Sequence, residues 1–103
     1  MERRGSAQDP SLDVVVVRVF GGLRESVRRT PLDFRAADVP TVAVLLARLD
    51  REEPDLARVL RAGLTEGYLN TLVNGRNARF LNGHDTPLAP GDVVAFLPPI
   101  GGG

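Results

Sequence analysis

The nearly continuous β-branched run LDVVVVRVF, residues Leu12 to Phe20, most constrains how this chain can fold. Four consecutive valines favour a strand, and only the late Arg18 interrupts the apolar stretch. Such a run is typical of a strand in the middle of a sheet that is covered on both faces. Because 103 residues leave room for one hydrophobic core, we expect a single sheet with one layer of helix.

A second strand and a helix are predicted after this run. Between Thr30 and Ala37 the apolar residues Leu32 and Phe34 alternate with charged ones, which indicates a half-exposed strand that forms a hairpin with the first. From Thr41 the period changes, and this residue stands where an N-cap is expected. The apolar positions Val42, Leu45, Leu46 and Leu49 then have helical spacing. The pattern predicts a helix of about three turns.

The second half of the chain predicts a short helix followed by strands. Pro54 is suited to open a short helix on the same sheet, and Gly63 marks its predicted end. The Asn74-Gly75 pair suits a tight hairpin turn that needs positive φ at both positions. A last strand is predicted from Asp92 to about Leu97, since two prolines then remove ladder donors.

Charge and composition exclude several classes of function. The 13 basic residues, all arginine, balance 13 acidic ones, so we expect neither nucleic acid nor a membrane surface as a partner. Without lysine, the chain offers no side-chain amine for acylation, and any covalent link must use its carboxyl end. The absence of cysteine and of a long apolar segment favours a cytoplasmic protein.

The interior of the sequence predicts no catalytic, cofactor or metal site. The single histidine, His84, lies in a loop pattern without a serine elbow. The acidic cluster Asp50 to Asp55 lacks the alternating spacing of a calcium loop, and a solvated helix junction is the better interpretation. The GGLRES segment fits a turn better than a phosphate loop. Three arginines, Arg24, Arg28 and Arg29, could dock an acidic partner, although scattered surface charge is the simpler interpretation.

The most distinctive segment is the ending FLPPIGGG. Pro98 and Pro99 stiffen its base, and Gly101, Gly102 and Gly103 add no side chains, so the tail can enter a narrow slot. Extended, it reaches on the order of 20 Å. Its α-carboxylate, with a pKa of about 3.5, is an anion and a poor electrophile. An ATP-dependent partner could activate it as an acyl-adenylate for attack by sulfur or nitrogen.

Three motifs in residues 73–103 carry a family resemblance: the V-N-G turn, the L-x-P-G-D-x-V turn and the P-P-x-x-G-G terminus. Together with VRVFGGLRE near the start, they resemble the MoaD/ThiS-type sulfur carriers, above all the small subunit of molybdopterin synthase. The resemblance implies an α+β, ubiquitin-like β-grasp: a mixed sheet of four to five strands packed on one main helix plus a short helix. Residues 1–11 are then a flexible lead-in, 12–97 the domain and 98–103 the extended tail.

The resemblance also implies a reaction cycle. An E1-like adenylyltransferase uses ATP to adenylate Gly103, and sulfur replaces the adenylate to give a thiocarboxylate. A larger molybdopterin synthase subunit then receives the tail for molybdenum cofactor biosynthesis, and Gly102 keeps its passage narrow. This chain binds no cofactor and has no catalytic site of its own, so it acts as a small subunit or carrier co-substrate.

Two departures keep other functions open. Gly101 stands where that family more often has alanine or a small polar residue, and the segment from Glu52 to Asn70 is longer than a minimal small subunit needs. The length and this insertion are similar to a carrier that supplies sulfide for cysteine synthesis. A ubiquitin-like modifier joined to lysine, or a non-covalent module with an inert tail, would use the same fold.

Docking is predicted at an apolar patch beside the tail. The patch comprises Phe80, Phe96 and Leu97, followed by Pro98, Pro99, Ile100 and Gly101. Strand alternation requires at least one of Phe96 and Leu97 to face the core.

Overall fold

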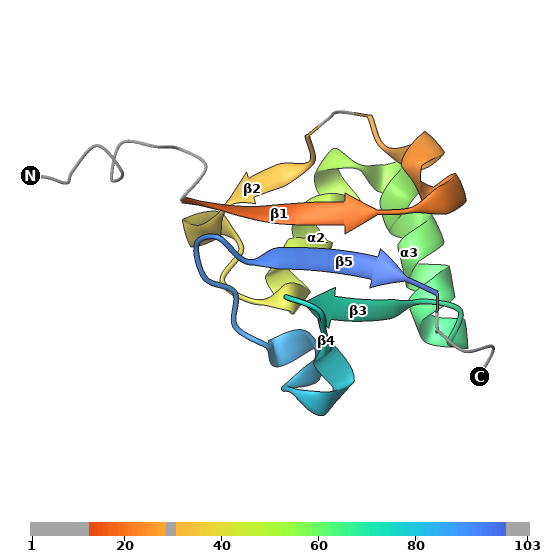
Figure 1. Ribbon diagram of the computed structural model, residues 1–103. Coiled ribbons are helices and arrows are strands. Elements are labelled where there is room, and N and C mark those ends of the chain that lie inside the picture. The colour runs from red at the N-terminus through yellow and green to blue at the C-terminus, as the bar shows by residue number, and fades with distance from the viewer. Residues whose placement is uncertain (1–12, 29–30, 99–103) are drawn as a thin grey trace, which may run out of the picture.

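The computed structural model describes residues 13–28 and 31–98, which form a five-stranded sheet with helices on one face (Figure 1). The strands are β1 (Val14–Val19), β2 (Asp33–Arg35), β3 (Asn70–Val73), β4 (Arg76–Asn77) and β5 (Val93–Leu97). The α-helices are α2 (Val42–Glu52) and α3 (Pro54–Glu66), and the short 3-10 helices are η2 (Gly21–Ser26), η3 (Ala36–Asp38), η4 (Ala78–Phe80) and η5 (Gly83–Asp85). The predicted lead-in 1–11 and the tail from Pro99 onward lie outside the described residues.

The sheet is mixed, as predicted, and has the strand order β2-β1-β5-β3-β4. The hairpin of β1 with β2 is antiparallel, and Val15 lies opposite Phe34. The last strand, β5, runs parallel to β1 and antiparallel to β3. β5 is therefore the central strand, and a neighbour on each side fixes its position.

Among the described residues, helices cover only one face of the sheet. Val15 and Val17 of β1 point into the core with Phe34, whereas Val14 and Val16 are half-buried and Arg18 is exposed. The prediction that β1 is covered on both faces is therefore wrong. The reason is that α2 and α3 both lie on the same side of the sheet (Figure 1), so the other face is left open.

The first helix follows its sequence signals, but the second does not end where expected. Thr41 caps α2, since its Oγ1 accepts a hydrogen bond of 3.2 Å from the Val44 N–H. Gly63 lies inside α3, which runs on to Glu66 and ends at Gly67 with a φ of 84°. A Cβ on Gly63 would lie 2.5 Å from Cδ1 of Leu69, so glycine here permits close packing. At 13 residues α3 exceeds the 11 of α2, so the expectation of one main and one short helix is wrong.

The two turn motifs of the C-terminal third are in direct contact. Asn74 and Gly75 have φ of 53° and 84°, as predicted for the hairpin turn between β3 and β4. The Asn74 side chain donates from Nδ2 to Oδ1 of Asp92 at 3.0 Å and accepts from the Val93 N–H at 2.9 Å. Asp92 in turn accepts from the Ala89 N–H at 2.9 Å. The contact between the V-N-G and P-G-D motifs therefore fixes the residue at which β5 begins.

Candidate docking surface at the base of the C-terminal tail

The tail leaves the domain from the end of the central strand. Val19 of β1 lies beside Phe96, and Asn70 of β3 lies opposite Leu97, the last residue of β5. Pro98 follows as an exposed residue outside any helix or strand. The ladders on both sides therefore hold the base of the tail in a defined place. The predicted site residues Pro99, Ile100, Gly101, Gly102 and Gly103 lie outside the described residues.

Of the two predicted docking residues on β5, only one is available to a partner. Phe96 has no exposed surface and belongs to the core beneath the helices, so its prediction as a docking residue is wrong. Leu97 is half-buried and belongs to the opposite set of side chains, on the open face. The strand period of two forces this division, and the requirement that at least one of the pair faces inward is confirmed.

An apolar surface adjoins Leu97 on the open face of the sheet. We define the open-face patch by its half-buried side chains on three neighbouring strands: Val14, Val16, Leu72, Val93, Ala95 and Leu97. The exposed Arg18 and Arg35 lie at its β1 and β2 side. A contiguous apolar surface with a charged rim is typical of a protein-binding site. Sequence reasoning named only Leu97, because the patch depends on which face the helices leave uncovered.

Two exposed aromatic residues flank the base of the tail. Phe20, directly after β1, is 45% exposed, and Tyr68, two residues before β3, is 68% exposed. In the sheet β1 and β3 are the two neighbours of β5, so these aromatics lie on either side of the strand that ends at Leu97. Sequence reasoning missed both residues. The sequence signal that could have found them is an aromatic residue next to each of the two strand ends that lie nearest to the tail.

Phe80, the third predicted docking residue, is 79% exposed and lies in η4, outside the three strands that form the open-face patch. It ends η4, which follows the edge strand β4, and the Arg79 guanidinium lies 5.4 Å from its ring centroid. Its exposure is therefore confirmed, and a role in docking stays a prediction.

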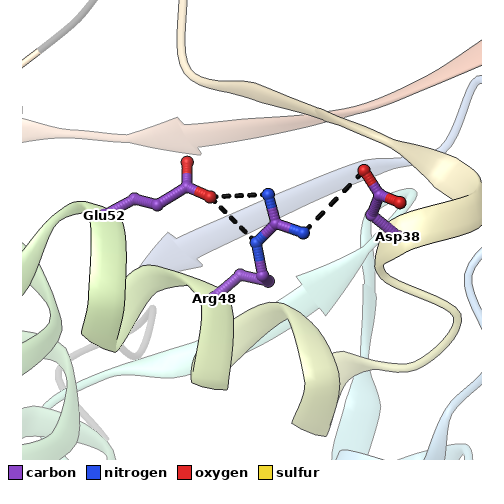
Figure 2. Close-up of polar contacts among 3 residues, drawn as sticks. All are labelled: Asp38, Arg48 and Glu52. Carbon is purple, nitrogen blue, oxygen red and sulfur yellow. Dashed lines mark hydrogen bonds and ion pairs between the residues drawn. The ribbon is translucent and has the colours of Figure 1, made fainter.

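The acidic cluster at the helix junction is engaged in ion pairs and hydrogen bonds. Arg48 lies between Glu52 and Asp38 in Figure 2, with its Nε 2.8 Å from Glu52 Oε2 and its Nη1 3.8 Å from Asp38 Oδ2. Arg58 pairs with Asp55 at 3.0 Å. Across the described ranges, no three His, Asp or Glu residues are placed to hold a metal ion. The interpretation of this cluster as a solvated junction fits the surface pairs of Asp50, Glu52 and Asp55, but it is wrong for Glu53, which is buried.

One member of the cluster, Asp50, has a perturbed pKa. Arg61 on α3 donates from Nε to Asp50 Oδ1 at 2.9 Å and also pairs with the second carboxylate oxygen. The hydrogen bonds and the positive charge of Arg61 hold the pKa of Asp50 below its usual value of 3.8. The same pairing raises the pKa of Arg61. The pair links α2 to α3 at the surface.

Glu53, between the two helices, is 1% exposed and accepts a hydrogen bond of 2.7 Å from the backbone N–H of Arg28. A buried carboxylate needs such donors, because burial without them costs several kcal/mol. Glu53 therefore fixes the segment after η2 against the helix junction, which is a structural role.

His84 lies exposed on η5. No helix in the described part of the chain is long and apolar enough to span a bilayer.

The five-stranded mixed sheet with its helices on one face defines the ubiquitin-like β-grasp class. This assignment agrees with a solved structure of similar shape, the small archaeal modifier protein 1 from Methanosarcina acetivorans. That structure has a TM-score of 0.67 and 32% identity, and the match covers 87% of this chain and 96% of that one.

Within this class, the chain belongs to the ThiS family, whose family model matches residues 17–103. Two curated relatives agree with this assignment. The small archaeal modifier protein 3 of Haloferax volcanii is 36% identical over 88 residues, which cover 84% of this chain and 96% of the relative. A putative sulfur carrier protein of Archaeoglobus fulgidus is 34% identical over 83 residues, which cover 79% and 93%.

Proposed function

We propose that this protein is a sulfur carrier that acts through the carboxylate of Gly103. In this proposal an E1-like adenylyltransferase transfers AMP from ATP to the carboxylate and releases pyrophosphate. A persulfide sulfur then attacks the acyl carbon and AMP leaves, and reduction of the resulting acyl disulfide by a thiol frees the thiocarboxylate. The chain supplies the carried group and binds no cofactor, so the activating enzyme provides the ATP site. We place the cycle in the cytoplasm, where ATP is available.

The observation that carries the proposal is the placement of Leu97 at the end of the central strand. Asn70 of β3 lies opposite this residue, Val19 of β1 lies beside the preceding Phe96, and the apolar open-face patch adjoins Leu97. A partner that docks on the patch would hold the domain rigidly while the tail reaches into its active site, which is the geometry that acyl activation requires. The match of the ThiS family model up to residue 103 supports the inclusion of the glycines in the functional unit.

We propose molybdopterin synthesis as the pathway, with the larger synthase subunit as the acceptor of the tail. The support is the P-P-x-x-G-G terminus and the V-N-G and P-G-D motifs, whose contact fixes the start of β5. A carrier of sulfur for cysteine or another metabolite would use the same activated terminus with a different acceptor.

Conjugation to protein lysines is the second candidate, and the small archaeal modifier protein 3 among the relatives favours it. The chemistry is the same up to the activated acyl group. A lysine amine then attacks the acyl carbon, the leaving group departs, and an isopeptide bond forms with loss of a proton. Because this chain has no lysine, it would serve as the acyl donor and not as a side-chain acceptor.

ATP–pyrophosphate exchange by the E1-like enzyme of the same organism tests the shared step. We expect exchange with the full chain and none after deletion of Gly103, whereas Arg76→Glu, at the opposite end of the sheet, should support normal exchange. Equal exchange with the deleted chain would contradict the proposal. Incubation of the adenylated protein with a persulfide donor, or with lysine-containing protein, then separates carrier from modifier by the covalent product.

A further inference from the structure

A groove of about 640 Å³ opens between β1, η2 and the pair Pro31 and Leu32 before β2. It exists because β2 is short: β2 pairs with β1 only as far as Val16, and the Val17 N–H donates to the Leu32 carbonyl at 2.8 Å. Beyond this point η2 lies across from the end of β1. Val17, Val19 and Leu32 give the groove apolar walls, and its volume falls in the range typical of binding pockets.

The rim of the groove carries two arginines that have no ion-pair partner among the described residues. Arg18 and Arg24 line it, both are exposed, and neither forms an ion pair within the described part of the chain. Among the described lining residues Glu25 is the only acidic one, against Arg18 and Arg24, so their summed charge is positive. The helix arginines Arg48 and Arg61 are, in contrast, paired with carboxylates. The rim charges are therefore available to an outside anion.

The groove opens at the same end of the sheet as the tail. Val19, in its wall, lies beside Phe96, so only the strand spacing of about 4.8 Å separates β1 from the strand that carries the tail. Phe20, one of the aromatics that flank the tail, is also a lining residue. A protein that holds the tail would thus have the groove within its footprint, together with the open-face patch.

We propose that this groove binds an acidic segment of the protein that handles the tail, with an apolar side chain of that segment in the groove. That this protein is the activating enzyme rests on the proposed function. The groove and its charges are features of the structure and do not depend on that function. An aliphatic side chain fills the space between Val19 and Leu32, and carboxylates on either side of it pair with Arg18 and Arg24. A second copy of this chain fits poorly, because Asp50, Glu52 and Asp55 of its acidic cluster are already paired with arginines.

Amide NMR spectra of the isotope-labelled full chain test the proposal with two capped peptides at low salt. One has the sequence Asp-Glu-Leu-Asp-Glu and its charge-reversed match has Lys-Lys-Leu-Lys-Lys. We expect the acidic peptide to shift the amides of Val19, Leu23 and Val27, with a Kd on the order of 1 mM, and the basic peptide to leave them unchanged. The proposal would be overturned if the chemical shifts of the groove amides did not change, or if they changed equally with both peptides.

Charge-reversal variants separate specific pairing with the rim arginines from attraction by the net charge of the protein. Arg24→Glu, alone or with Arg18→Glu, should raise the Kd of the acidic peptide about fivefold or more. Arg76→Glu makes the same change of net charge on β4 and should have little effect. The substituted side chains are exposed and have no ion-pair partner within residues 13–28 and 31–98, so the variants should fold, which circular dichroism verifies. An equal loss of peptide affinity in Arg24→Glu and Arg76→Glu would contradict binding of the peptide in the groove.

The same variants connect the groove to activation of the tail. In the exchange assay Arg24→Glu should raise the KM for this protein severalfold and leave kcat near the unsubstituted value, because the groove contributes binding and not chemistry. An unchanged KM would remove the activating enzyme as the occupant. If the unsubstituted chain is not adenylated at all, the proposed function fails, and the peptide titration still decides whether the groove binds.

Discussion

The Asn74 side chain bridges the β3–β4 turn to Asp92, the residue before β5, through a hydrogen bond of 3.0 Å. Its carbonyl oxygen also accepts from the Val93 N–H at 2.9 Å. One residue therefore shapes the hairpin turn by its positive φ and sets where the last strand begins. Since β5 ends at the tail, this contact is part of what places the base of the tail.

Two variants of Asn74 should separate these roles in urea unfolding. Asn74→Gly keeps the positive φ and loses only the side-chain bonds, so we expect a loss of about 1 to 2 kcal/mol in unfolding free energy. Asn74→Ala loses the bonds and must also adopt a left-handed backbone, so it should cost about 1 kcal/mol more. Equal stability of the two variants would show that the positive φ carries no cost at this turn.

Two buried threonines offer a matched test of polar burial, since Thr71 and Thr86 are each 5% exposed. Thr86 donates from its hydroxyl to the Gly83 carbonyl at 2.7 Å and accepts from the Asn82 N–H at 3.1 Å. The Thr71 hydroxyl has no partner among the described residues. Thr86→Val should therefore lower the unfolding free energy by about 1 to 3 kcal/mol, and Thr71→Val should leave it unchanged or raise it by about 1 kcal/mol.

Thermal and urea unfolding of both variants measure this difference. Equal destabilisation by the two substitutions would mean that the Thr71 hydroxyl has a stabilising partner, contrary to the structure.

Gly63 should resist substitution although it lies within a helix. Alanine normally gains about 1 kcal/mol over glycine there, but its Cβ would lie 2.5 Å from Cδ1 and 2.7 Å from Cγ of Leu69. We expect Gly63→Ala to cost about 1 to 2 kcal/mol net, because the whole Leu69 side chain must move. Gly22→Ala, with no atom within 4 Å of its Cβ, is the control and should be close to neutral. A stabilising Gly63→Ala would contradict the close packing.

Local signals predicted most of the fold, and tertiary packing decided the rest. Thr41 and the Asn74-Gly75 pair act through nearby backbone groups, so the sequence alone located the start of α2 and the hairpin. Gly63 was misleading, because a glycine that ends a helix and one that admits a neighbouring side chain look alike in sequence.

The candidate site was predicted less completely than the fold. Strand alternation showed that Phe96 and Leu97 face opposite sides, but only the position of α2 and α3 shows which of the two is buried. The run of valines in β1 likewise indicated a central strand and could not show that one face is open. The groove depends on how early β2 ends, which no local pattern encodes.

Arg61 should control the titration of Asp50. In carboxyl NMR titrations we expect the pKa of Asp50 to lie below 3.8 and to return toward it in Arg61→Gln. Arg51→Gln removes the same charge beside Asp50 without a hydrogen bond to it and should change the pKa less. Because the folded pKa is lowered, the pair stabilises the fold above the unfolded pKa of about 3.8, and this contribution is lost as pH falls through the folded value. Equal shifts in both variants would contradict the assignment to Arg61.

The intact mass of the protein purified from its own host, without a C-terminal tag, shows whether Gly103 carries sulfur. We expect a species in which one oxygen is replaced by sulfur, located at Gly103 by fragmentation and absent when Gly103 is deleted from a folded chain. A chain that carries only an ordinary carboxylate under conditions where its pathway is active, or a deletion that still supports the pathway, would contradict the claim that Gly103 carries the sulfur.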